Sequence, residues 1–213
     1  MRNPGKSDQG VGRVALVRGP ILSTTRSINN EATPSIAYAY IGGYLQAQGY
    51  KVSLIDGVAE ALNNIWVPEA YPGYHCQGLS LDDVISRIPA DSDVICFSAM
   101  FSGEWPIVRD LIFHVRRAFP DALLVAGGEH LTALTEYSLR DCPDLDVCVR
   151  GEGEHTVFEL IEAWRDGAGF AGIDGIGFLG DDGQYRHGEG LPRIRDVGTL
   201  PWPYWPEGYL EKF

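Results

Sequence analysis

Two short apolar segments in the middle of the chain each end in a glycine-rich turn. Residues 122–126 are followed by Gly127-Gly128, and residues 145–149 are followed by the sequence RGEGE, residues 150–154. A helical pattern of apolar residues begins after each turn. In a parallel α/β sheet, ligands bind in the crevice outside the carboxyl ends of the strands. The two turns therefore predict such a sheet, with a ligand crevice at the edge where they lie.

Strand-like and helix-like segments alternate five times along the chain. The predicted strands are residues 13–17, 51–55, 93–97, 122–126 and 145–149. Each strand is nearly all apolar, as expected when helices cover both faces of a sheet. The fold class predicted is α/β: a doubly wound, Rossmann-like, five-stranded parallel sheet with helices on both faces.

The segments between the first strands are less regular. Residues 18–33 are polar and predict a long loop, and residues 63–79, rich in proline, glycine and aromatic residues, predict an irregular excursion. Pro34 suits the first turn of a helix that ends at Gln48. Gly42-Gly43 lies inside this helix, where each glycine lowers helix stability by about 1 kcal/mol relative to alanine. Close packing against the sheet or a ligand accounts for that pair, and so does simple tolerance.

The pattern changes after Gly167. Residues 174–179 and 184–186 flank Asp182-Gly183, which is typical of a β-hairpin. The residues from Leu200 onward contain three prolines and several aromatic residues without any helix or strand period, which indicates a linker. We therefore expect a flexible N-terminus at 1–12, an α/β domain at 13–168, and a hairpin with a linker at 169–213.

Composition narrows the possible partners and compartment. The net charge of −12 argues against a nucleic-acid partner, because phosphate binding needs clustered lysine and arginine. No apolar run approaches the ~18 residues of a membrane span, and residues 1–12 do not resemble a signal peptide. None of the four cysteines forms C-x-x-C. We expect a cytoplasmic protein that has no membrane or nucleic-acid partner.

The candidate ligand-binding residues lie in the loops that follow the predicted strands. Ser98-Ala99-Met100 offers a hydroxyl beside apolar groups, which suits a flat heterocycle with one polar edge. Gly127-Gly128 permits positive φ and close approach of a ligand, although it also serves as a plain strand-to-helix turn. His130 is the one histidine that the pattern places at the crevice, either contacting a cofactor or capping a helix. Glu152 and Glu154 lie at a predicted helix N-terminus, where capping and catalysis are both open.

A dinucleotide site is disfavoured. The loop after the first strand, beginning Arg18-Gly19-Pro20, lacks the G-x-G-x-x-G pattern. The turn at Gly151 and Gly153 comes close to that pattern, but two carboxylates there would repel a pyrophosphate. P-loop, G-x-S-x-G and H-E-x-x-H motifs are absent as well. A nucleotide-dependent Rossmann-like enzyme remains as one alternative.

Four segments resemble the N-terminal cobalamin (B12)-binding domain of B12-dependent radical SAM enzymes. They are PSIAYAYIGGYLQAQGYKVSLID at 34–56, DVICFSAM at 93–100, LLVAGGEHLTALTE at 123–136 and DVCVRGEGEHTVFELIEAW at 146–164. The tail resembles the segment that joins this domain to the radical SAM core, so the resemblance spans about residues 13–206. The combination of G-G-x-H with R-G-E-G-E carries most of its specificity.

The resemblance implies a cobalamin whose dimethylbenzimidazole tail is buried between sheet and helices. Ser98-Ala99-Met100 corresponds to a Ser-x-Leu element, and Gly127-Gly128 to a Gly-Gly element that lets the tail pass. The motif Asp-x-His-x-x-Gly, which ligates cobalt in another B12 subfamily, is absent, which implies cobalt without that histidine. The cofactor contacts expected are Thr33, Pro34, Ser98, Met100, Gly127, Gly128, His130, Gly151 and Glu152. No residue is assigned to catalysis or as a metal ligand.

The cysteine spacing C-x-x-x-C-x-x-C, which holds the iron–sulfur cluster of a radical SAM core, does not occur. The chain alone is therefore not expected to cleave S-adenosylmethionine; the 4Fe-4S cluster and S-adenosylmethionine would belong to an absent core. We expect the cobalamin-binding module of a radical SAM enzyme, most often a methyltransferase. The partner core lies in the same longer chain or in a separate protein. A stand-alone corrinoid carrier or sensor is the second alternative, and the linker-like tail favours the first reading.

Overall fold

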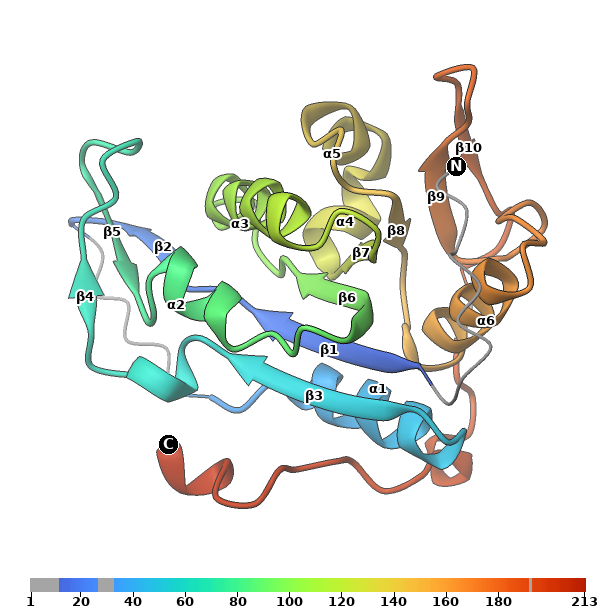
Figure 1. Ribbon diagram of the computed structural model, residues 1–213, viewed down its shortest axis with the longest axis horizontal. Coiled ribbons are helices and arrows are strands. Elements are labelled where there is room, and N and C mark those ends of the chain that lie inside the picture. The colour runs from blue at the N-terminus through green and yellow to red at the C-terminus, as the bar shows by residue number, and fades with distance from the viewer. Residues whose placement is uncertain (1–11, 27–32, 192) are drawn as a thin grey trace.

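The computed structural model describes residues 12–26, 33–191 and 193–213. A seven-stranded sheet, in the order β10-β9-β8-β7-β6-β1-β3, forms its centre (Figure 1). The five parallel strands are β1 (Arg13–Arg18), β3 (Lys51–Asp56), β6 (Ser92–Ser98), β7 (Leu123–Gly127) and β8 (Val147–Val149). They match the five predicted strands, so the predicted α/β fold class is confirmed.

Helices cover both faces of the sheet because side chains alternate along each strand. On one face, Ala15 and Val17 of β1 join a cluster with residues of α2 (Leu81–Ser86), α3 (Trp105–Ala118), α4 (Glu129–Ala133) and α5 (Thr135–Asp141). On the other face, Val14 and Leu16 pack with α1 (Ile36–Ala47) and α6 (Glu154–Arg165).

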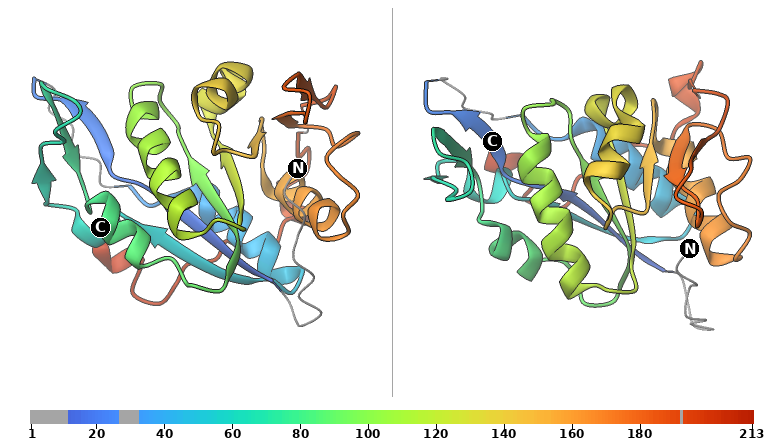
Figure 2. Two further views of the ribbon diagram at one scale, coloured as in Figure 1. Left: turned by 45° about the horizontal axis from the view of Figure 1, so that its top comes forward. Right: turned by 90° about the horizontal axis from the view of Figure 1, so that it is seen from above.

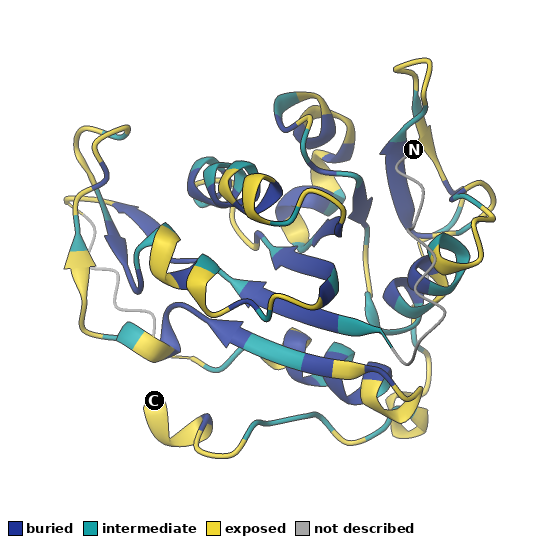
Figure 3. Cartoon of the chain, in the orientation of Figure 1, coloured by how far each residue is buried: buried dark blue, intermediate teal, exposed yellow. Residues whose placement is uncertain are grey.

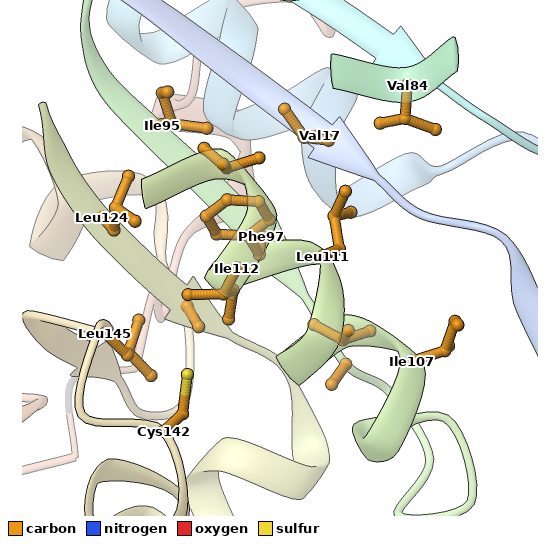
Figure 4. Packing of buried hydrophobic residues seen from close by; sticks show 14 of the residues in the cluster. Val17, Val84, Ile95, Phe97, Ile107, Leu111, Ile112, Leu124, Cys142 and Leu145 are labelled. Carbon is orange, nitrogen blue, oxygen red and sulfur yellow. The ribbon is translucent and has the colours of Figure 1, made fainter. Parts of the chain in front are cut away.

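The packing of α3 shows how such a cluster is built. Its apolar stripe, which includes Ile107, Leu111 and Ile112, faces Phe97 of β6 and Leu124 of β7 (Figure 4). Each of these five side chains is at most 2% exposed. Burying a side chain of this size contributes about 1.5–3 kcal/mol. The sheet is thus fixed firmly beneath the loops at its carboxyl edge.

The strand order sets the place of a ligand site. Chain order along the parallel strands reverses between β1 and β6, where α1 covers one face and α3 the other. This is the topological switch point, outside which ligands bind in open α/β sheets.

The C-terminal hairpin forms as predicted but continues the main sheet. Strands β9 (Ile176–Leu179) and β10 (Tyr185–His187) are antiparallel, and Gly183 in their turn has φ +72°. Strand β9 also pairs antiparallel with β8. Ile176 and Phe178 are buried in the same cluster as α6, and this burial fixes the hairpin onto the sheet.

The loop and the excursion predicted at 18–33 and 63–79 form a second, three-stranded sheet, so these two predictions were wrong in part. It has the order β2-β5-β4, with β2 (Ile21–Thr24), β4 (Ile65–Trp66) and β5 (Tyr74–Gln77) all antiparallel. Leu22 and Cys76 are paired across it and buried. Strands of two to four residues, separated by about fifty residues of chain, carry too short a pattern to be recognised. Residues 27–32 lie outside the described residues.

The C-terminal segment docks on α1. Figures 1 and 2 show it (red) running along the α1 side of the molecule. The Tyr204 N–H donates to the carbonyl of Ala39 at 2.8 Å. A Cβ on Gly43 would lie 2.3 Å from the carbonyl oxygen of Trp202. Close packing therefore accounts for a glycine at position 43, and the neighbour is this segment, not the sheet or a ligand.

The end of this segment reaches the carboxyl end of β3. The hydroxyl of Tyr209, a residue 4% exposed, donates to Oδ2 of buried Asp56 at 2.6 Å. Figure 3 shows that much of the remaining segment is exposed or half-buried. Two short 3-10 turns, η2 (Val197–Thr199) and η3 (Leu210–Lys212), are its regular elements, and a third, η1 (Ala59–Ala61), follows β3.

The flexible N-terminus predicted at 1–12 falls outside the described residues, apart from Gly12. Within the described ranges, no helix combines the length and the apolar character needed to span a bilayer.

Candidate functional site

A cavity of about 240 Å³ lies between α1, α6 and the carboxyl ends of β6, β7 and β8. We call it the α1–α6 pocket. Apolar side chains from both helices and from the strands line its depth, among them Tyr38, Ile41, Val125, Val149 and Val157. An apolar cavity of ~150 Å³ admits benzene, so a larger fused aromatic ring fits a cavity of this kind.

A second cavity of about 260 Å³ lies beside the first, at the topological switch point. We call it the switch-point pocket. It is bounded by the loop after β1, the start of α1 and the loop after β6. Three residues line both cavities: Ala37, Ser98 and Met100. The two cavities therefore adjoin each other along one edge of the sheet.

One glycine of the Gly127-Gly128 pair has a conformation that other residues rarely adopt. Gly128 has φ +108°, and a Cβ there would lie 2.5 Å from the carbonyl oxygen of Ala99. Gly127 does not have positive φ, and a Cβ there would meet only ordinary contacts, the nearest at 3.6 Å. Gly128 thus uses its positive φ to let two strand-end loops pack together, whereas the close approach of a ligand to the pair stays a prediction.

Eight of the nine predicted contact residues line one pocket or the other. Ser98, Met100, Gly127, Gly128, Gly151 and Glu152 line the α1–α6 pocket. Thr33 and Pro34 line the switch-point pocket. Residues from four separate segments of the chain are thus brought to one edge of the sheet.

His130 lies elsewhere. Its side chain is 3% exposed and lines neither pocket. Its ring stacks on Trp105, with centroids 5.0 Å apart, and bonds to the hydroxyls of Ser102 and Ser138. Burial lowers the pKa of His130, and the nearby Asp141 carboxylate partly opposes that effect. The predicted cofactor contact of His130 is therefore not supported by its position: the turn of α4 points the ring into the core.

A match to a family model identifies the domain that carries these two pockets. The B12 binding domain model matches residues 29–161, which include the Gly127-Gly128 turn and most of both pockets. The chain belongs to the B12-binding domain family. The predicted resemblance is confirmed, and with it cobalamin as the cofactor of the domain.

Curated relatives share this region at low identity. An uncharacterized methyltransferase of Pyrococcus horikoshii is 26% identical over 206 residues, covering 95% of this chain and 40% of the relative. Cytidylyl-2-hydroxyethylphosphonate methyltransferase of Streptomyces wedmorensis is 24% identical, covering 98% and 43%. Anaerobic magnesium-protoporphyrin IX monomethyl ester cyclase of Synechocystis is 30% identical, covering 87% and 34%. The chain spans less than half the length of each.

Solved structures share the fold. The cobalamin-dependent S-adenosylmethionine radical enzyme OxsB, with aqua-cobalamin and S-adenosylmethionine bound, superposes with a TM-score of 0.68 at 18% identity, over 91% of this chain and 24% of its own. The radical S-adenosylmethionine methyltransferase TsrM of Kitasatospora setae, with cobalamin and a [4Fe-4S] cluster bound, gives 0.60 at 18% identity, over 92% and 32%.

The α1–α6 pocket of this B12-binding domain offers both kinds of contact that cobalamin needs. Its depth is apolar, which suits the dimethylbenzimidazole ring. At its rim, Oε2 of Glu154 is buried and has no hydrogen-bond partner among the described residues. The amide side chains of a corrinoid carry N–H donors that such an acceptor can bind. The glycines at 127, 128, 151 and 153 also line this pocket.

The roles left open for Glu152 and Glu154 become distinct. The Glu152 carboxylate accepts a hydrogen bond from the backbone N–H of Ile194. The N-cap of α6 is Gly153, which has no side chain to cap the helix. Glu152 thus ties the C-terminal segment to the rim of the pocket, while Glu154 lies in the first helical turn, where a carboxylate is favoured by the helix dipole.

Tyr38 is a pocket residue that the sequence did not reveal. It is 3% exposed, and its hydroxyl donates to the carbonyl of Val17 at 2.7 Å. Burial raises its pKa well above the ordinary tyrosine value, so the hydroxyl stays protonated. The ring lines the α1–α6 pocket, and the sequence around it carries no pattern that marks this role.

The four cysteines carry no site chemistry. All are free and buried. Burial raises the pKa of Cys76, Cys96 and Cys142 to about 12, and that of Cys148 further. Neutral thiols are poor nucleophiles and poor metal ligands. In the part of the chain that the structure describes, no three His, Cys, Asp or Glu side chains gather in a group suited to a metal ion.

Proposed function

We propose that this chain binds one cobalamin along the carboxyl edge of its sheet. The dimethylbenzimidazole tail enters the α1–α6 pocket, and the corrin ring lies over the switch-point pocket. The observation that carries this proposal is the α1–α6 pocket itself, an apolar cavity at the carboxyl ends of β6, β7 and β8, where Gly128 at φ +108° packs against Ala99.

The proposed contacts fall into two groups. Ser98, Met100, Gly127, Gly128, Gly151 and Glu152 meet the tail and its linker, while Thr33 and Pro34 meet the corrin. Residues 18–33, the loop after β1, contain no histidine. This loop would therefore offer a bound cobalamin no histidine side chain, as the absence of Asp-x-His-x-x-Gly also implies.

We further propose that the domain works within a radical SAM methyltransferase. Two of the relatives above are named as methyltransferases, and both solved structures are of radical S-adenosylmethionine enzymes. Bound cobalamin supplies a methyl carrier. This chain's residues hold it and exclude water from its tail, while radical generation belongs to a core with its own 4Fe-4S cluster. The cyclase relative keeps ring formation open as a second outcome for the full enzyme.

The thiols support a reducing compartment for this work. Four free, buried cysteines and no disulfide among the described residues are typical of cytoplasmic proteins. We propose that the domain is cytoplasmic.

The experiment that tests the cofactor site uses hydroxocobalamin. The 213-residue chain is incubated with an excess, desalted, and its absorption spectrum recorded, with protein measured independently. We expect about one corrinoid per chain and a shift of the corrin bands toward a state without the lower base. The nucleotide alternative predicts instead thermal stabilisation by nucleotides and none by cobalamin.

A further inference from the structure

Three loops form the mouth of the α1–α6 pocket, and all three are bonded to one short helix. The loops follow β6, β7 and β8, and the helix is α4, which begins directly after Gly128. Helix α4 contributes only Glu129 to the pocket lining. Several of its polar contacts are made with the loops themselves, and they suggest a role that sequence patterns did not reveal.

His130 connects α4 to the loop after β6. Its backbone N–H donates to the carbonyl of Ala99 at 3.3 Å. Its Nδ1 lies 2.9 Å from Oγ of Ser102, near the other end of the same loop. The ring is held from behind by Trp105, the first residue of α3, which stacks on it. One buried side chain thus fixes the loop that carries Met100.

The hydrogen-bond partners of the His130 ring determine which of its two nitrogens carries the proton. Oγ of Ser138 lies 3.2 Å from Nε2 of His130 and also donates to the carbonyl of Leu134 at 2.9 Å. A hydroxyl has one proton, so Ser138 accepts from Nε2–H. Nδ1 is then the acceptor for the Ser102 hydroxyl. The neutral ring with its proton on Nε2 satisfies both contacts, and burial of the ring favours that neutral form.

Thr132 connects α4 to the loop after β8. Its Oγ1 accepts from the backbone N–H of Gly151 at 3.0 Å. Its own N–H donates to the carbonyl of Gly128 at 2.9 Å. Gly151 has φ +73°, so the loop turns sharply at the point where Thr132 holds it. The two residues are two positions apart on α4 and reach the loops on either side of β7.

We propose that His130 and Thr132 are positioning residues that hold the three loops in the arrangement cobalamin requires. They touch no cofactor. They act by keeping the mouth of the α1–α6 pocket in its open, binding-competent form before cobalamin arrives. This inference rests on the proposed function, since it assigns the preorganisation of the same site. If the site is in its binding-competent form for only a fraction of the time, the apparent Kd is the intrinsic Kd divided by that fraction.

The test compares matched variants of the 213-residue chain. His130→Ala removes both ring contacts, and His130→Asn keeps an acceptor toward Ser102. Thr132→Val removes one acceptor at nearly constant shape. His114→Ala, an exposed histidine of α3, and Thr25→Val, an exposed threonine, are the controls. The Kd for hydroxocobalamin is measured at a temperature where circular dichroism shows every variant to be folded.

We expect the Kd to rise about tenfold for His130→Ala and about threefold for Thr132→Val. The loss should appear in the association rate, with partial recovery in His130→Asn and no change in the controls. A merely structural role would lower the melting temperature and leave the Kd of the folded protein unchanged. Unchanged binding in folded His130→Ala and Thr132→Val would overturn the inference. If His130→Ala does not fold, Thr132→Val and Ser102→Ala decide by the same criterion.

A second readout needs no cofactor. Hydrogen exchange of the Ala99, His130 and Gly151 amides is followed in the free protein. We expect faster exchange at positions 99 and 130 in His130→Ala, and at 151 in Thr132→Val, than in the controls. If the unaltered chain binds no cobalamin, the proposed function fails. The exchange pattern still tests whether His130 and Thr132 hold the three loops. Exchange rates equal to those of the controls would overturn it.

Discussion

The two ends of the main sheet carry cavities of similar size and different construction. At the amino end, a cavity of about 290 Å³ lies among the α6 C-terminus, the hairpin and the start of β7. At the carboxyl end lie the α1–α6 pocket and the switch-point pocket, each somewhat smaller. Volume alone would place the site at the amino end. The strand topology favours the carboxyl end instead, because ligands bind outside the carboxyl ends of parallel strands.

The difference lies in what the backbone and polar groups do. At the amino end, Arg116 bonds to the Asp146 carboxylate at 2.6 Å and to the carbonyls of Ala122 and Asp144. These contacts tie strands and loops to one another. At the carboxyl end, Gly128 brings loops together at positive φ, and Glu154 keeps a carboxylate oxygen free of partners among the described residues. The amino end is thus tied by contacts among its own strands and loops, whereas the carboxyl end carries two adjoining cavities lined by strand-end loops.

The largest effect should come from Gly128→Ala. The added Cβ would meet the Ala99 carbonyl at 2.5 Å in a strained backbone conformation. We expect a loss of about 3 kcal/mol of stability and at least ~10-fold weaker cobalamin binding. Denaturant unfolding and cobalamin titration measure the two effects.

Gly49→Ala is its matched control. Gly49 ends α1 with φ +91° and nothing lies within 4 Å of an added Cβ. It should cost about 1 kcal/mol for the positive φ alone and leave cobalamin binding intact. Equal binding losses in both variants would show that the carboxyl-edge geometry has no special role.

Arg116→Met tests the amino end. Arg116 is 6% exposed, and its removal leaves the Asp146 carboxylate and two carbonyls without their donor. We expect about 3 kcal/mol of destabilisation, measured by urea unfolding. The Kd for cobalamin of the folded variant should equal that of the unaltered chain. A higher Kd in the variant would show that the two ends of the sheet are coupled, and it would contradict the difference between them.

Glu154→Gln should have a smaller effect confined to binding. The amide keeps an acceptor oxygen but loses the charge, so we expect about fivefold weaker cobalamin binding with unchanged stability. Glu159→Gln, an exposed position on the same helix, is the control. Isothermal titration of both variants measures the difference, and equal affinities would remove Glu154 from the site.

The smallest effect is a pH dependence of stability. The pKa of His130 is lowered in the folded protein, by burial first. The unfolded chain therefore binds a proton more readily, and the stability from the neutral ring is present above the unfolded value of ~6.5 and lost as pH falls below it. The melting temperature should drop between pH 7.5 and 5.5 more in the unaltered chain than in His130→Asn. An identical drop in both would contradict the assignment of a buried neutral ring.

Strands with a continuous apolar pattern were predictable, and so was the edge at which they end. The five parallel strands match their predicted segments because each is nearly all apolar, with few polar residues to obscure the pattern. The N-cap of α2 is local in the same way: Oγ of Ser80 accepts a hydrogen bond from the Asp83 N–H, three residues later. Features of this kind can be predicted from the sequence because they depend only on neighbouring residues.

Features that depend on distant partners were not predictable. Strand β2 pairs with β5 across fifty residues, and Gly43 is explained by Trp202, far along the chain. His130 has the sequence position of a crevice residue, yet a single turn of α4 aims its ring at Trp105. Eight of the nine contact residues predicted from the sequence line the two pockets, because a glycine-rich turn fixes the place of a loop although it does not fix the direction of the next side chain.

The most direct measurement of the central claim is the stoichiometry of cobalamin retained by the unaltered chain and by Gly128→Ala after gel filtration. The account predicts about one corrinoid per unaltered chain and a markedly lower amount on the folded variant. Equal retention by the two proteins, or none by either, would contradict a cobalamin site built at the Gly128 turn.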